Sequence, residues 1–191
     1  MSRQKILEAA FQLFSEGNYN GVSLENIAEK VGIKKPSIYA HFQSKDQLFL
    51  QILDREIDRI AVYIEENMMY KPLHTSEAAL YNYLIASLEF IDKNTMSVRF
   101  YNRIFNSPPS NLIDEISIKF DYIHNITTVI KVDILKNSIL NKHIKRMPLE
   151  KLLYSFNSLL IGNIAMVMRE ERLEVEKVNF TWKLYWNSIK K

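Results

Sequence analysis

One short segment of this 191-residue chain gathers side chains that can contact a nucleic acid. They are basic, hydroxylic or aromatic, with one proline among them: Lys34, Lys35, Pro36, Ser37, Tyr39, His41 and Lys45. Lysine can neutralise a phosphate or reach the acceptors of guanine, whereas hydroxyls and a histidine N–H can hydrogen-bond phosphate oxygens or base edges. The segment therefore favours DNA binding. The alternative is the solvated face of an ordinary helical packing unit.

Presenting these side chains requires two short helices joined by a tight turn. Ser23 is suited to cap the first helix, because its hydroxyl can accept a free backbone N–H of the first turn. Ile27, Ala28 and Val31 then form one apolar face. Gly32 follows, where a left-handed backbone conformation is inexpensive, so the chain can turn sharply.

The second helix is predicted to begin at Pro36, whose missing N–H is no loss in a first turn. Ile38 and Phe42 are four residues apart and should both point inward. Ser44 is then expected to cap a third helix, with Gln47 completing a capping box. Ahead of the pair, residues 3–15 have apolar residues at helical spacing and can cover it.

The order of these pieces resembles the N-terminal DNA-binding domain of TetR-family transcriptional regulators. The resemblance covers residues 3–53 and rests on Ile6-Leu-Glu-Ala-Ala-Phe-Gln-Leu-Phe14, Val22-Ser23, Ile27-Ala28, Val31-Gly32-Ile33 and Ser37-Ile-Tyr-Ala-His-Phe-Gln-Ser-Lys-Asp-Gln-Leu48. It implies that Lys35, Pro36 and Ser37 approach bases or phosphates in the major groove. It also implies that Tyr39, His41 and Lys45 grip the DNA backbone. Lys34 stands where many family members have a small capping residue, and Lys35-Pro36 replaces a frequent Lys-Gly pair.

The remaining chain has a helical pattern and is predicted to be all-α. One stripe runs from Leu48 to about Tyr70 and ends at Pro72, and a helix opens at Ser76. Further helices are expected over residues 98–105, 111–139, 149–172 and 175–189, for about nine helices in total. The resemblance implies a helix-turn-helix DNA-binding domain at residues 1–46 and a larger helical ligand-binding and dimerisation domain at 47–191.

The larger domain offers candidates for a small-molecule site. Pockets are mostly apolar with a few convergent polar groups. Aromatic and polar residues that fit this description are Phe100, Arg103, Phe120, His124 and Asn157. They suggest a mostly apolar or aromatic effector, although such residues more often belong to a core.

The last two helices suggest an association surface. Residues 149–168 are apolar nearly all round, so a single core face cannot cover them. The expected interface residues are Leu160, Ile164, Met168, Trp182, Tyr185 and Ile189. A homodimer would let two reading helices address successive major grooves of a two-fold operator. An intramolecular bundle face is the alternative.

Composition is that of a globular protein, with 47% hydrophobic and 25% charged residues and a net charge of +3. The absence of cysteine excludes disulfides and thiolate metal sites. No signal peptide and no membrane span of about 20 apolar residues is expected, which favours the cytoplasm. No catalytic motif is present, the four histidines are scattered, and we expect no enzyme activity, cofactor or metal.

The sequence therefore predicts a DNA-binding transcriptional regulator. Repression relieved by a ligand and binding to double-stranded operator DNA as a homodimer are what the family resemblance implies. A helical adaptor that binds only protein is the alternative.

Overall fold

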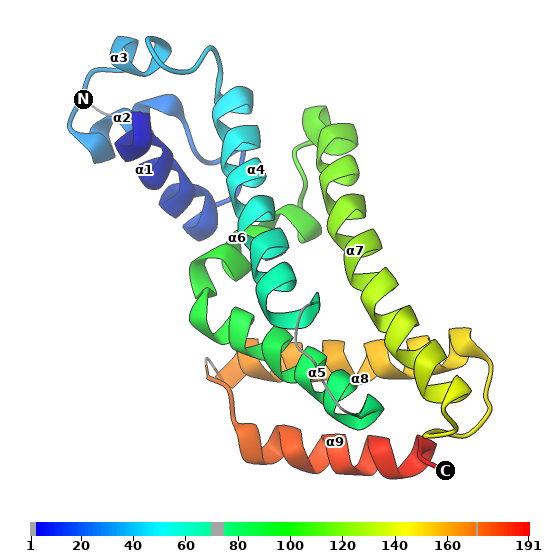
Figure 1. Cartoon of the computed structure of the whole chain (residues 1–191). Helices are drawn as coiled ribbons and strands as arrows, with labels where there is room; N and C mark the ends of the chain where they lie inside the picture. Colours follow the sequence, from blue (N-terminus) through cyan, green and yellow to red (C-terminus); the bar gives the residue numbers. More distant parts are fainter. Residues whose placement is uncertain (1–2, 70–74, 171) are drawn as a thin grey trace. The chain divides into compact units, whose positions relative to one another are not determined.

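The computed structural model describes residues 3–69, 75–170 and 172–191 (Figure 1). Within these ranges the fold is all-α, as predicted. Its nine α-helices are α1 (Arg3–Glu16), α2 (Leu24–Val31), α3 (Pro36–Tyr39), α4 (Lys45–Ile64), α5 (Ser76–Lys93), α6 (Thr95–Asn106), α7 (Ile113–Leu140), α8 (Leu149–Glu170) and α9 (Val175–Ile189). A π-helical turn, η1 (Glu65–Met69), continues α4, and a 3-10 turn, η2 (Ser110–Leu112), precedes α7. Tyr70, Pro72 and His74 lie outside the described residues.

The chain divides into two compact units. The first unit comprises Met1–Ile60 and Thr95–Ile123, and the second comprises Ala61–Asn94 and His124–Lys191. The helices α4 and α7 each contribute residues to both units. The first unit thus contains all of the helix-turn-helix domain predicted at residues 1–46, together with most of α4, α6 and the start of α7.

The turn between α2 and α3 has the predicted caps. Ser23 Oγ accepts a hydrogen bond from the Asn26 backbone at 3.1 Å, and Asn26 Oδ1 accepts one from the Ser23 backbone at 3.0 Å. At the other end Gly32 has a φ of 75°, and the Ile33 N–H reaches the Ala28 carbonyl at 2.9 Å. Both ends of α2 are therefore closed by local bonds.

The short helix α3 begins at Pro36, as the sequence predicted. Ile38 and Phe42 are buried in the first unit. At the start of α4, Ser44 Oγ accepts from the Gln47 N–H at 3.0 Å, as expected. The Gln47 side chain instead accepts from the Gln43 N–H at 2.7 Å, one residue before the donor of a standard capping box.

Aromatic rings form the centre of the first unit. The Phe49 ring of α4 lies 5.1 Å from Phe14, 5.0 Å from Tyr19 and 5.5 Å from Phe100, measured between ring centroids. Phe100 also meets Phe11 at 5.5 Å with its ring edge-on. Such arrangements are favourable for aromatic pairs and fix the spacing of the helices that carry them. The packing therefore joins α1, the following turn, α4 and α6.

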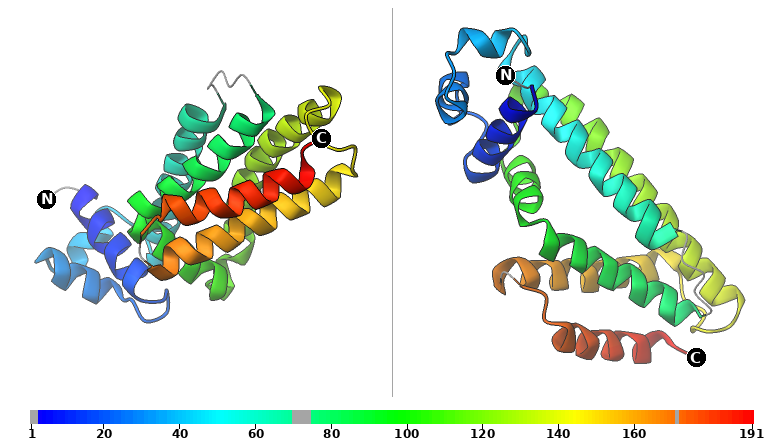
Figure 2. Two further views of the ribbon diagram at one scale, coloured as in Figure 1. Left: turned by 90° about the horizontal axis from the view of Figure 1, so that it is seen from below. Right: turned by 60° about the vertical axis from the view of Figure 1, so that its left-hand side comes forward.

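The second unit is built around α5, α8 and α9. The helices α8 and α9 lie side by side and run in opposite directions (Figures 1 and 2). Its core includes Leu84, Phe156, Trp182 and Trp186, the last two with rings stacked 5.8 Å apart. The segment after α7 is fastened to the C-terminus, where the Lys145 N–H donates to the Ile189 carbonyl at 2.8 Å.

By length and composition alone, α8 is apolar enough to cross a membrane, although no such span was predicted from the sequence. In this structure the helix packs against α5 and α9. Leu152, Phe156, Leu160 and Val167 are its buried residues.

Replacement of Gly32 tests the left-handed turn. Gly32→Ala should lower the free energy of unfolding by about 1–2 kcal/mol, because a Cβ disfavours this backbone conformation. A Cβ at this position would meet no atom within 4 Å, so crowding does not add to the cost. Gly32→Asn should cost less, since asparagine tolerates the left-handed region better. Urea unfolding followed by circular dichroism would measure both variants, and equal stability of the alanine variant and the wild type would contradict the assignment.

Candidate nucleic-acid interface

Six of the seven side chains predicted to contact DNA are exposed on and around α3. Lys34, Lys35, Pro36, Ser37, Tyr39 and His41 are all exposed, and Tyr39 retains 52% of its accessible surface. Ile38, between them, is fully buried. The helix therefore has one face that is buried through Ile38 and one face that is exposed and polar. The six exposed residues lie together on this segment.

Lys35 forms an ion pair with Glu25 of α2. The Lys35 Nζ lies 3.5 Å from Glu25 Oε2, and both side chains are largely exposed. Exposed pairs of this kind are weak, about 0–1 kcal/mol. The lysine can therefore exchange this carboxylate for another anion at little cost.

Lys45 holds the turn between α1 and α2. Its Nζ donates to the carbonyl oxygens of Tyr19 at 3.0 Å and Val22 at 3.1 Å. The ammonium also lies 4.0 Å from the centroid of the Tyr19 ring. Burial lowers the pKa of Lys45. Two of the three ammonium donors are thus engaged within the protein, and a phosphate contact by Lys45 stays a prediction.

A polar network continues from the same turn. The Tyr19 hydroxyl donates to Asp46 at the start of α4, and Asp46 accepts a second bond from Asn111 Nδ2 at 2.7 Å. Burial raises the pKa of the Tyr19 phenol, and the hydrogen bond to Asp46 raises it further. Sequence reasoning missed these residues because they are far apart in the chain, and nothing local marks them as partners.

A buried carboxylate fastens α4 to α6. Glu56 is 1% exposed, yet its oxygens accept from Ser97 Oγ at 2.6 Å and pair with Arg55 at 3.0 Å and Arg59 at 3.2 Å. Arg55 also pairs with Glu8 of α1 at 2.8 Å. A buried charge is tolerable when it is paired and hydrogen-bonded, as here.

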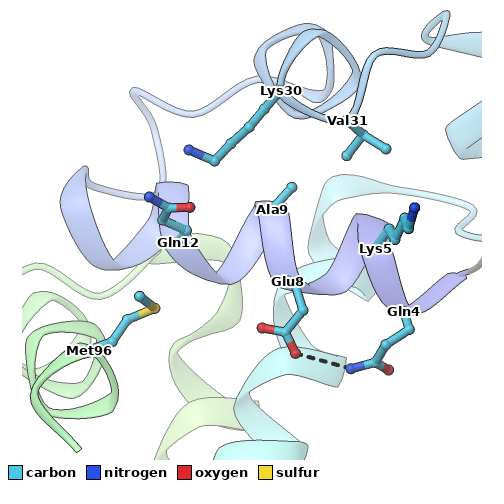
Figure 3. A pocket seen from close by; sticks show the side chains of 8 residues that line it. All are labelled: Gln4, Lys5, Glu8, Ala9, Gln12, Lys30, Val31 and Met96. Atoms are coloured by element: carbon cyan, nitrogen blue, oxygen red, sulfur yellow. Dashed lines mark hydrogen bonds between the residues drawn. The ribbon is translucent and has the colours of Figure 1, made fainter.

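An open groove of about 440 Å³ lies beside α1 and α2 (Figure 3). Long polar side chains line it, among them Lys5, Gln12 and Lys30. Figure 3 also shows the bond between Gln4 and Glu8 along its edge, 3.0 Å long. A pocket for an apolar ligand would need to enclose most of its surface. This groove is open to solvent and does not.

The residues predicted to bind a ligand are divided between the two units. Phe100 is fully buried in the aromatic core of the first unit, and Arg103 donates to the Glu16 carbonyl at 3.0 Å. Phe120, also in the first unit, packs on Tyr101 with ring centroids 6.1 Å apart. His124 is exposed, and Asn157 hydrogen-bonds Lys131. Phe100 therefore serves the core, because it fills the space between α1 and α4.

The residues predicted to form a dimer interface are mostly core or half-buried. Leu160, Trp182 and Ile189 are buried in the second unit, while Ile164, Met168 and Tyr185 are half-buried. The three buried residues pack in the interior of their own chain, and their part in an interface stays a prediction. The exposed apolar residues of the same helices are Tyr154, Ile161, Met166, Val175, Phe180 and Leu184. The association surface is better sought at these positions.

Comparison with protein families finds a match for the N-terminal helices. Residues 6–52 match the family described as bacterial regulatory proteins, tetR family. The matched range contains most of α1, all of α2 and α3 and the first turns of α4, and so includes every residue predicted to contact DNA.

Two curated relatives carry the similarity further. One relative is the biofilm operon icaADBC HTH-type negative transcriptional regulator IcaR of Staphylococcus aureus strain Newman. The two sequences are 36% identical over 107 residues, and this alignment covers 56% of this chain and 55% of IcaR. The chain is 36% identical over 94 residues to the HTH-type transcriptional repressor ComR of Escherichia coli K12, covering 49% of this chain and 44% of that one. The chain thus spans about half the length of the curated relatives it matches.

Solved structures share the fold over the whole chain. A putative transcriptional regulator from Saccharomonospora viridis in complex with choline superimposes with a TM-score of 0.76 at 17% identity. The superposition covers 99% of this chain and 97% of that one. At this identity the likeness shows the fold alone.

The two bonds of Lys45 predict a measurable loss of stability. Lys45→Met keeps the length of the side chain but leaves the Tyr19 and Val22 carbonyls without their donor. It should lower the free energy of unfolding by about 1–3 kcal/mol. Lys34→Met is the matched control, because Lys34 is exposed, and it should change stability by less than about 0.5 kcal/mol. Equal effects in urea unfolding would contradict a structural role for Lys45.

Proposed function

We propose that the chain is a member of the TetR family of bacterial regulatory proteins, whose description matches residues 6–52, and that it is a ligand-responsive transcriptional repressor. It binds a two-fold operator in double-stranded DNA as a homodimer. It acts in the cytoplasm, where its DNA lies, and catalyses no reaction. The helix-turn-helix domain of residues 1–46 binds the operator, and residues 47–191 bind the effector and the second subunit.

One observation carries this proposal. The exposed set on α3 is basic, hydroxylic and aromatic, and it is mounted on a buried Ile38 and a capped turn. A rigid mount matters, because hydrogen bonds to base edges require a fixed orientation of the reading helix. Lys34, Lys35 and Ser37 would approach bases or phosphates, and Tyr39 and His41 would contact the backbone. Lys45 would contribute mainly by holding the turn.

The homodimer is proposed to use the exposed apolar residues of α8 and α9. Ile161 and Phe180 retain 64% and 63% of their accessible surface. Gly162, beside Ile161, has no atom within 4 Å of the place where a Cβ would stand. The surface is therefore open and apolar at these positions. Two reading helices about 34–36 Å apart in such a dimer would fit successive major grooves.

The proposed regulation would follow from an effector that has different affinities for two forms of the protein. An effector that binds more tightly to a form whose reading helices are wrongly spaced lowers the affinity for DNA. The helix α4 is suited to carry the change, because it begins beside the turn held by Lys45 and continues into the second unit. The choline complex of the Saccharomonospora viridis protein supports a small-molecule site in this fold.

DNA binding is tested by titrating the full-length protein against DNA from upstream of its own gene and against random-sequence DNA. Fluorescence anisotropy at several salt concentrations between 50 and 200 mM gives affinity and salt slope. We expect saturable, salt-sensitive binding that prefers the upstream DNA. Lys34→Ala should reduce the salt slope by about 1, since one phosphate contact is lost.

Two variants show which side chains contribute to DNA binding. Tyr39→Ala should weaken binding without reducing the salt slope, because it removes an uncharged contact. Lys136→Ala, an exposed lysine on α7, is the charge control and should bind like the wild type. The absence of binding at the lowest salt would contradict the regulator and favour a helical adaptor that binds only protein.

The dimer surface is tested by placing charge on it. Ile161→Glu and Phe180→Glu should each convert the protein from a dimer to a monomer in analytical ultracentrifugation, because a carboxylate would be buried without a partner. Their helix content by circular dichroism should be unchanged. Phe105→Glu is the control, since Phe105 is 81% exposed on α6, and it should leave the dimer intact. An unchanged mass for both first variants would refute this surface.

A further inference from the structure

The second unit contains a lysine inside its core. Lys131 of α7 is 6% exposed. Its Nζ donates to Asn157 Oδ1 of α8 at 2.8 Å and lies 5.8 Å from the centroid of the Tyr83 ring of α5. Three helices thus converge on one ammonium group.

No carboxylate compensates this charge among the residues that the structure describes. The sole hydrogen-bond acceptor that Lys131 has there is the neutral amide of Asn157. Burial lowers the pKa of Lys131, as expected for an ammonium without an opposite charge beside it. Glu56 in the first unit is the contrast, because two arginines and a serine serve its carboxylate. Glu56 thus has ionic partners, whereas the acceptor of Lys131 is neutral.

A second polar group lies in the same core. The hydroxyl of Tyr185 on α9 is buried and makes no hydrogen bond of standard geometry within the described part of the chain, and the Ser155 hydroxyl is its polar neighbour. Its ring packs 5.9 Å from Phe156, which in turn packs 5.9 Å from Tyr83. The unsatisfied phenol therefore belongs to the aromatic cluster that includes the ring beside the lysine.

This core has an excess of donors over acceptors. An ammonium carries three N–H donors and no acceptor, and Asn157 uses one of them. A carboxylate carries two oxygens with about four acceptor sites and a negative charge, which is what the lysine lacks. Ile130, Ile134 and Leu153 pack against the same cluster.

We propose that the second unit binds an apolar monocarboxylate, with its carboxylate on the Lys131 ammonium and its aliphatic or aromatic body among the surrounding helices. Asn157 acts as a positioning residue, because its bond fixes the direction of the lysine. This inference rests on the proposed ligand response and names the chemical class of the effector.

The test uses the full-length protein and a defined set of probes. Octanoate, decanoate, benzoate and phenylacetate are compared with their primary amides, and inorganic phosphate serves as an anion without an apolar body. Binding is followed by the fluorescence of Trp182 and Trp186 and by the shift in melting temperature. We expect at least one carboxylate to bind about 10- to 100-fold more tightly than its amide, because a charge-assisted bond is lost in the amide.

Two lysine variants locate the site. Lys131→Met preserves most of the side-chain length without the charge, and it should reduce the preference for carboxylate over amide to about onefold. Lys136→Met removes the same charge from an exposed position on the same helix and should keep the full preference. Lys131→Met is also expected to melt at a higher temperature than the wild type without ligand, since an uncompensated buried charge has been removed.

The outcomes separate this inference from the function it rests on. It is overturned if no carboxylate shifts the wild type, if acid and amide bind equally, if phosphate binds as well as the carboxylates, or if Lys131→Met retains the preference. Should Lys131→Met fail to fold, the comparison of acid and amide on the wild type still decides. Carboxylate binding that leaves DNA affinity unchanged supports the site and refutes the proposed ligand response.

Discussion

The contacts around the Phe49 ring are the constraint on which the first unit depends. The helices α2 and α3, with eight and four residues, are too short to be stable in isolation. Their residues Ile27 and Ile38 are buried in the same core as Phe49. Phe14, Tyr19 and Phe100 pack against the Phe49 ring and complete this core. Phe100 comes from α6, well beyond the segment that would touch DNA. The precision of the candidate interface is therefore set partly by residues that never approach it.

The buried charges of the two units differ in their hydrogen-bond and ionic partners. In the first unit, the Glu56 carboxylate is satisfied by Ser97, Arg55 and Arg59, so it locks α4 to α6 in one arrangement. In the second unit, the Lys131 ammonium has a neutral amide for its acceptor within the described residues. A satisfied buried charge gives rigidity, and an unsatisfied one gives a site with affinity for an anion. A rigid surface suits the proposed binding of DNA. A buried ammonium group that lacks an anionic partner suits the proposed binding of a carboxylate.

Local chemistry made much of this structure predictable. The cap at Ser23 and the left-handed turn at Gly32 depend on neighbouring residues alone, so sequence sufficed for them. Where a helix is apolar on every side, the spacing of its apolar residues does not show which side is buried. The pattern therefore predicts Leu160 at an interface, although Ile161 is the exposed residue. The sequence does not predict the partners of Lys45 either, because they are backbone carbonyls in a turn more than twenty residues earlier.

The first unit is assembled from two stretches of chain that are separated by residues 61–94. On a ribosome that adds roughly 5–20 residues per second, the N-terminal helices emerge seconds before Phe100 and Ile116 are made. During that interval Phe49 lacks one of its partners, and the nascent chain exposes an apolar surface that other proteins can meet. A product released early, before α6, would lack the core that shapes its recognition helix. The order of synthesis thus leaves α3 on an unfinished core until α6 has been made.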